Sequence, residues 1–128
     1  MKKKNKAIII FIICIITVIA TVVFAITRNL SNMMIVDLHG VDTTALDDGY
    51  YTGTFERGRF TNTLTVQIED NRIVGIAPYS DMWAARSEIS DDVFNKVIEA
   101  QSTDIDAFSG ATVTSNAYLM AIEDALTD

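Results

Sequence analysis

The most apolar part of the chain is a continuous run close to the N-terminus. Residues 7–26 contain no charged side chain, and Thr17 and Thr21 alone interrupt the apolar ones. A helix of 20 residues rises about 30 Å, which matches the hydrocarbon core of a bilayer. The pattern therefore predicts a basic arm at residues 1–6 and a transmembrane helix at residues 7–27.

Beyond the apolar run, three short stretches have the composition or alternation of β-strands: 50–57, 60–69 and 72–77. In the second stretch Leu64, Val66 and Ile68 fall on one face and polar residues on the other, which predicts a half-buried strand. Asp70 and Asn71 suit the tight turn that comes next, and we expect Pro78 to end the third strand. Together the stretches predict an antiparallel meander.

Two helices are predicted in the second half of the chain, over Ser90–Ala100 and Ser115–Leu126. Ser90 is expected to be the N-cap of the first, with Asp91 and Asp92 in its opening turn. The second helix carries an apolar face, which consists of Tyr118, Leu119, Ala121, Ile122, Ala125 and Leu126. The expected fold class is α+β, with a small antiparallel sheet packed against two or three helices.

The segments between these elements are less regular. Residues 28–46 are interpreted as a stalk or linker, in which the apolar cluster 33–36 is a candidate for a docked strand and His39 is a solvated surface residue. The compact domain is expected over residues 47–128. Within it, Asp81–Arg86 is a candidate helical turn, and Ile105–Phe108 is expected to be extended.

Charge is divided unevenly along the chain and predicts its orientation in a membrane. Lys2, Lys3, Lys4 and Lys6 precede the apolar run, whereas the part after it carries six basic and 17 acidic residues, a net charge of 6 − 17 = −11. Basic flanks remain in the cytoplasm, so the domain is expected outside. A signal peptide cleaved after Ala25 is the alternative, and it also exports the domain. The acidic balance excludes a nucleic-acid partner.

Candidate chemistry is concentrated in the segment Asp106-Ala107-Phe108-Ser109-Gly110-Ala111-Thr112-Val113-Thr114-Ser115. It is rich in hydroxyls and small residues and lies where the chain is expected to enter its last helix. Backbone N–H groups and the positive end of a helix dipole face an anion at such a place. The residues alone are compatible with a phosphate site and also with ordinary capping of the helix.

The run Asp106-x-x-Ser109-Gly110-Ala111-Thr112 resembles the flavinylation motif of the FMN-binding domain family. That family includes the C-type subunit of the sodium-pumping NADH:quinone oxidoreductase and the G-type subunit of the Rnf complex. The wider block 101–115 and the stretch 48–53 are similar to the family as well. The resemblance covers nearly all of the chain from Asp47 onward.

The resemblance implies covalent FMN, joined by a phosphoester to the hydroxyl of Thr112. A separate exported flavin transferase, which uses FAD and Mg²⁺, would make this bond. Ser109, Gly110 and Ala111 would leave room for it, and Asp106 would orient the loop or help to activate the hydroxyl. Thr114 and Ser115 are candidates either for phosphate contacts or for helix capping.

An isoalloxazine ring needs an apolar or aromatic wall, for which Trp83 is the preferred candidate. Tyr79, Met82 and Phe108 are the others, and ordinary core packing is the alternative for each. The chain departs from the ion-pumping relatives in one place: they carry a Glu-Thr-Pro-Gly-like segment after the meander, whereas residues 78–83 here are shorter and different.

These features predict a membrane-anchored extracytoplasmic flavoprotein that relays electrons from a membrane donor to an extracytoplasmic acceptor. It would be an electron-transfer carrier rather than an independent enzyme, with no catalytic residues and no metal site of its own. Two alternatives remain open. One is a subunit of an ion-translocating redox complex, and the other is a non-redox exported binding module that retains the fold.

Overall fold

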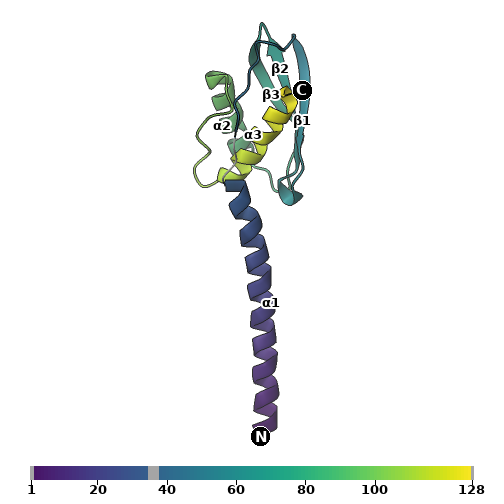
Figure 1. Cartoon of the computed structure of the whole chain (residues 1–128), viewed down its shortest axis with the longest axis vertical. Coiled ribbons are helices and arrows are strands. Elements are labelled where there is room, and N and C mark those ends of the chain that lie inside the picture. The colour runs from purple at the N-terminus through teal and green to yellow at the C-terminus, as the bar shows by residue number, and fades with distance from the viewer. Residues whose placement is uncertain (1, 35–37, 128) are drawn as a thin grey trace. The chain divides into compact units, whose positions relative to one another are not determined.

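The computed structural model describes residues 2–34 and 38–127, and it describes side chains for residues 3–28 and 38–127. The chain divides into two compact units, one ending at Ile35 and one beginning at Val36. The first unit holds helix α1. The second holds three strands, a short 3₁₀ turn and helices α2 and α3 (Figure 1).

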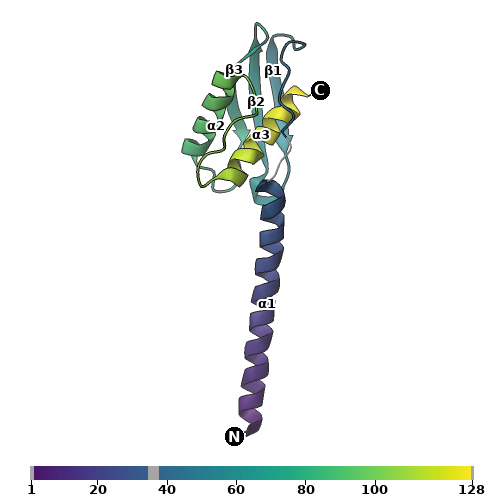
Figure 2. The same ribbon diagram turned by 60° about the vertical axis from the view of Figure 1, so that its left-hand side comes forward.

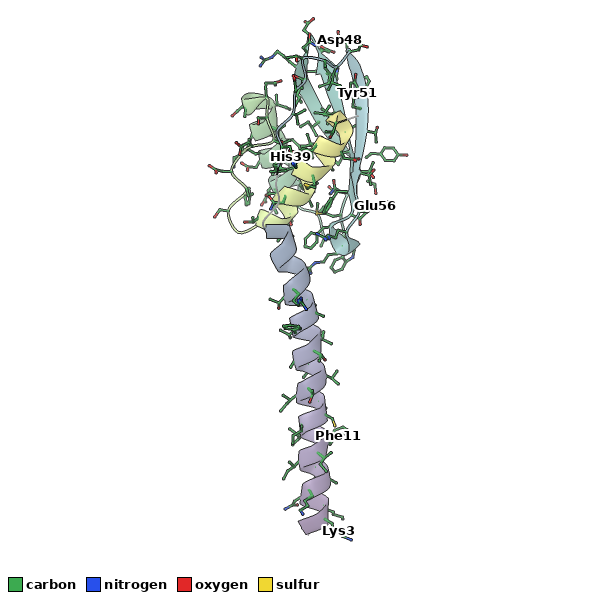
Figure 3. The ribbon with its side chains drawn as sticks, viewed as in Figure 1. Lys3, Phe11, His39, Asp48, Tyr51 and Glu56 are labelled. Carbon is green, nitrogen blue, oxygen red and sulfur yellow. The ribbon has the colours of Figure 1, made fainter. Side chains whose placement is uncertain are left out.

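Helix α1 spans Lys2–Met34, and its apolar side chains, such as Phe11, extend outward along its length (Figure 3). The stretch Lys3–Arg28 is long and apolar enough to cross a membrane. The hydroxyls of Thr17 and Thr21 donate to backbone carbonyls one turn earlier, so neither leaves a polar group without a partner within the helix. The helix continues beyond residue 27, so the first part of the expected stalk is helical.

Strands β1 (Gly49–Phe55), β2 (Asn62–Glu69) and β3 (Arg72–Ser80) form an antiparallel sheet in the order β1-β2-β3. This is the predicted meander. Asp70 and Asn71 form the turn between β2 and β3, with φ angles of 50° and 60°. Positive φ at both central residues is what a two-residue hairpin turn requires. Leu64, Val66 and Ile68 are fully buried on one face of β2, as their alternation predicts.

The strand boundaries differ from those expected in two places. Strand β3 does not end at Pro78 but runs through it to Ser80. Because β3 is an edge strand, it pairs with β2 alone, and a proline, which has no N–H group, is tolerated there. The second difference lies before β2, where Gly58–Phe60 forms a 3₁₀ turn (η1) and delays the start of the strand to Asn62.

Helices α2 (Ser87–Ala100) and α3 (Thr112–Leu126) cover one face of the sheet (Figure 2). Helix α3 packs on β1 and β2, and α2 packs on β3 and on α3. The apolar face predicted for the last helix is buried throughout. The α+β class is confirmed, with two helices on the sheet in the domain that the structure describes over residues 38–127.

The helix starts were predicted incorrectly. Helix α2 begins three residues before Ser90, with Arg86 as its N-cap, and Ser90 is buried and donates to the carbonyl of Ser87. Burial of the Ser90 side chain explains the error, since an N-cap hydroxyl lies at the helix end. Asp91 and Asp92 consequently fall outside the first turn. Helix α3 begins at Thr112 instead of Ser115.

Two other segments also differ from expectation. Asp81–Arg86 contains a single turn, closed by a 3.0 Å hydrogen bond from Ala85 N to Met82 O, and no helix. Ile105–Phe108 lies outside regular structure and pairs with none of the three strands.

Residues 38–46 lie on the hairpin turn between β2 and β3. The Asn71 side-chain amide donates to the carbonyls of Thr44 (2.9 Å) and Leu46 (3.3 Å), and the Thr43 hydroxyl donates to the carbonyl of Asn71. His39 is exposed, as expected. No strand forms within residues 38–46, and residues 35–36 of the candidate docked strand lie outside the described part. The segment therefore belongs to the second compact unit and is not a free linker.

Candidate functional site

The segment 108–111 forms a tight turn that leads directly into α3. Ala111 N donates to Phe108 O at 2.9 Å, and Gly110 has a φ of +80°. Positive φ strongly favours glycine, so the glycine of the motif is needed for the shape of the turn. The turn delivers Thr112 to the first position of the helix.

The Ser115 hydroxyl joins this turn to the helix. Its Oγ accepts a hydrogen bond from Phe108 N at 3.1 Å and donates one to Ala111 O at 2.9 Å, and the side chain is fully buried. It therefore makes contacts at both ends of the turn. Ser115 is not the N-cap of α3; its hydroxyl instead fixes the backbone before Thr112.

Thr112 lies at the start of α3, where backbone N–H groups have no acceptor within the helix. The helix has Ala111 as its N-cap, and no side chain caps it. The first amides of an α-helix have no intrahelical acceptor, and the helix dipole makes this end positive. Thr112 is half-buried, and within residues 38–127 no hydrogen bond involves its hydroxyl. The hydroxyl therefore has no hydrogen-bond partner among the described residues, at a helix end whose amides suit an anion.

An open hollow of about 280 Å³ adjoins this end of α3. Gly110, Ala111 and Thr114 line it from the motif, and Trp83 lines it from the turn after β3. Trp83 lies 27 residues before Gly110 in the sequence, and the fold brings it together with these three motif residues. Its volume is near the lower limit for small-molecule pockets, about 300 Å³.

The other side of the hollow carries positive charge and an aromatic ring. Arg59 and Phe60 line it from η1, and Arg86 lines it from the N-cap of α2. The Arg59 guanidinium lies over the Phe60 ring, 4.9 Å from its centroid. Arg86 pairs with Glu88 at 3.0 Å on the exposed surface. No carboxylate lines the hollow among the residues that the structure describes.

Trp83 occupies the tip of the Met82–Ala85 turn and is 81% exposed. The base of this turn is anchored by Asp81, whose Oδ1 accepts hydrogen bonds from Met82 N (2.8 Å) and from the Tyr118 hydroxyl (2.7 Å). Burial raises the pKa of Tyr118 far above its ordinary value, and the adjacent Asp81 carboxylate raises it further. Tyr118 stays neutral and holds the turn that carries the tryptophan.

The remaining candidates for the flavin wall are placed differently. Met82 is buried and also lines the hollow, so it contributes an apolar floor. Tyr79 is 82% exposed on β3 and does not line the hollow. Phe108 is half-buried in the motif turn and does not line it either.

Asp106 lies apart from this hollow. It lines another one, of about 570 Å³, with Lys96, Glu99, Asp104 and Ile105. Ser109 is exposed and does not line the smaller hollow. The structure therefore brings Gly110, Ala111, Thr114 and Trp83 together and leaves Asp106 and Ser109 outside. Thr112 does not line the hollow itself but directly follows Ala111, which does.

Sequence reasoning missed Arg59, Phe60 and Arg86. They lie 20 to 47 residues before Asp106, where the motif begins, and no spacing connects them to it. The one indication was compositional, because arginines are rare in so acidic a domain.

The donors and walls of this hollow fit FMN. First-turn amides of α3 suit the phosphate, arginines add positive charge, and Trp83 offers an aromatic face to a ring. Among the described residues, no group of three or more His, Cys, Asp or Glu side chains is arranged to hold a metal ion.

A search of curated proteins finds no match to this chain. A comparison with protein-family models matches residues 21–127 to the FMN-binding domain. The matched range includes the whole sheet, both packed helices and the hollow beside Thr112. By this match, the chain belongs to the FMN-binding domain family, and its domain follows an apolar helix long enough to cross a membrane.

Proposed function

We propose that this protein is a membrane-anchored flavoprotein that carries FMN on the Thr112 hydroxyl and relays electrons outside the cytoplasm. One observation carries the proposal. Thr112 opens α3 with an unengaged hydroxyl, next to a hollow lined by Trp83 and two arginines. When bound, FMN supplies the redox chemistry, and the chain supplies the place and the surroundings.

The attachment is a phosphoryl transfer that a partner enzyme performs. The Thr112 oxygen bonds to the FMN phosphorus of FAD, the pyrophosphate bond breaks, AMP leaves, and the threonine proton passes to a base of the flavin transferase. Mg²⁺ on the transferase neutralises the phosphates. No electrons are transferred in this step, and the product is a phosphodiester with one negative charge.

The residues of this chain prepare the acceptor. Gly110 and Ala111, the two residues before Thr112, carry no side chain larger than a methyl group, which leaves room for the transferase and the phosphate. Ser115 fixes the backbone on both sides of the turn. The first amides of α3 then lie next to the phosphodiester charge, where hydrogen bonds to an anion are strongest.

The membrane helix and the charges support the expected location. Four lysines precede the apolar run, and acidic residues outnumber basic ones in the rest of the chain. With the basic arm in the cytoplasm, Thr112 faces the exported transferase. The electron donor then lies in the membrane and the acceptor lies outside.

The test is in-gel flavin fluorescence of the full chain, co-expressed with an exported flavin transferase and denatured in SDS. We expect a fluorescent band for the wild type and for Ser109→Ala, which removes the neighbouring hydroxyl. Thr112→Ala is expected to be dark, and Thr112→Ser is expected to restore fluorescence because it keeps a hydroxyl. A dark wild type, or fluorescence that survives Thr112→Ala, contradicts the proposal.

A further inference from the structure

We propose that Arg59 and Arg86 make the hollow beside Thr112 selective for a phosphorylated flavin over an uncharged one. This inference deepens the proposed function and rests on it, because it concerns the same site. It assigns to two residues outside the motif a recognition of the flavin phosphate that does not depend on the covalent bond.

Because the domain is strongly acidic, binding of an anionic phosphate requires positive charge close to the site. The part of the chain after residue 26 has a net charge of −11, which repels an anionic ligand. At physiological ionic strength charges are screened over about 8 Å, so the residues that line a site decide its local potential. Here two of the six basic residues of this part line one hollow, and no carboxylate among the described residues does.

Arg59 is available to a ligand. Among the described residues no carboxylate pairs with it, and its guanidinium stacks on the Phe60 ring. Stacking restricts the guanidinium to one region at the rim of the hollow. A cation held in this way loses less conformational freedom when an anion binds.

Arg86 can exchange its present partner, Glu88, for a phosphate. Its partner Glu88 lies at 3.0 Å, but both side chains are mostly exposed, at 65% and 74%. An ion pair in this setting is worth about 0.2–1 kcal/mol. A phosphate that offers two oxygens to the planar guanidinium forms a stronger pair, so Arg86 is expected to leave Glu88 for the ligand.

The third contribution comes from α3. The first amides of the helix adjoin the hollow through Ala111 and Thr114. Two arginines and the residues of this helix end therefore line the same hollow. A ring held against Trp83 would keep its phosphate within this positive region.

The experiment measures non-covalent binding to the full-length Thr112→Ala chain in a non-ionic detergent. Trp83 is the only tryptophan of the chain, so quenching of its fluorescence reports a flavin in the hollow. The probes are FMN, riboflavin and inorganic phosphate. FMN is expected to bind at least tenfold more tightly than riboflavin, and inorganic phosphate is expected to compete with FMN.

Arg59→Gln and Arg86→Gln are each expected to weaken FMN binding about tenfold and to leave riboflavin binding unchanged. Arg72→Gln is the matched control, because it removes the same charge at the far end of β3 and should change FMN binding less than twofold. Equal binding of FMN and riboflavin overturns the inference. So do an absence of quenching, a failure of phosphate to compete, or an equal effect of all three substitutions. Covalent labelling of the wild type is a separate measurement, so the proposed function can stand if this inference fails.

Discussion

The backbone of α3 passes so close to Gly53 that a Cβ placed there would lie 2.0 Å from the carbonyl oxygen of Ala121. It would also lie 2.5 Å from the backbone nitrogen of Ala125. The Thr54 amide donates to the Asp124 carboxylate at 2.8 Å, one residue further along β1. Gly53 therefore sets how closely α3 approaches the sheet, and α3 begins with the proposed flavin acceptor.

Gly53→Ala is expected to destabilise the domain by about 3 kcal/mol or more, because backbone atoms cannot move aside as a flexible side chain can. Amide hydrogen exchange of the β2 core in the full chain measures this loss. Gly49→Ala, in the same strand, is the control, since a Cβ there meets nothing within 4 Å. Equal protection in the two variants would contradict the close approach.

Ser115→Ala is expected to slow covalent flavinylation about tenfold while the fold persists. The substitution leaves the Phe108 amide without its acceptor, at a cost of about 1–3 kcal/mol, and removes one of the two hydrogen bonds from residue 115 to the Ala111 carbonyl. The motif turn then spends less time in the reactive shape. The measurement is the initial rate of labelling by excess transferase.

Ser102→Ala is the control for that experiment. Its hydroxyl accepts from Asp104 N in the preceding loop and does not touch the motif turn. The labelling rate of this variant should match the wild type. A Ser115→Ala chain that is labelled at the normal rate would refute the positioning role.

The sequence predicted the elements whose side chains alternate or recur with a clear period. The burial of Leu64, Val66 and Ile68, the turn at Asp70 and Asn71, and the buried face of α3 all follow from periodicity and turn chemistry. The α+β class and the family resemblance are confirmed by the fold and by the family match.

The sequence could not locate the helix starts, because the residues there have tertiary roles. Ser90 and Ser115 look like caps, but both are buried and bond to backbone inside the fold. Nor could it connect Arg59 and Arg86 with the motif, since that depends on how α3 packs on the sheet and on α2. Residues 38–46 were interpreted as linker for a similar reason: their partner, Asn71, lies about 28 residues away.

Tyr118 predicts how stability depends on pH. Its pKa is raised in the folded state, so folding favours the protonated hydroxyl, and this contribution is fully present below the unfolded value of about 10. Stability should therefore fall as the pH rises above about 10, where the unfolded state alone loses the proton. Tyr118→Phe should flatten that fall and cost about 1 kcal/mol at pH 7, through loss of the bond to Asp81.

Urea unfolding of the full chain between pH 7 and 11 measures both effects of Tyr118→Phe. Tyr79→Phe is the control, because that ring is 82% exposed and the hydrogen bond to Asp81 comes from Tyr118. The two variants should differ in slope above pH 10. Identical slopes would mean that Tyr118 does not carry the dependence.

Substitution of Asn71 distinguishes two ways in which it could hold residues 38–46: through its side-chain amide or through its backbone conformation in the turn. Asn71→Gly keeps the positive φ of 60° accessible but removes the amide that donates to Thr44 and Leu46. We expect the hairpin to persist and hydrogen exchange to rise about tenfold within residues 38–46. Unchanged protection there would show that other contacts, such as the 3.2 Å bond from Gly40 N to Glu123, suffice.

The proposed orientation predicts which cysteines react with a membrane-impermeant maleimide on intact cells. Cys14 is the only cysteine of the chain and lies in the apolar run, so Cys14→Ala gives a background without thiols. In that background Asn95→Cys, at an exposed position on α2, should be labelled before lysis. Lys4→Cys, in the basic arm, should be labelled only after lysis, because the arm is expected on the cytoplasmic side. The reverse pattern would place Thr112 in the cytoplasm, beyond the reach of an exported transferase, and would remove the electron-relay proposal with it.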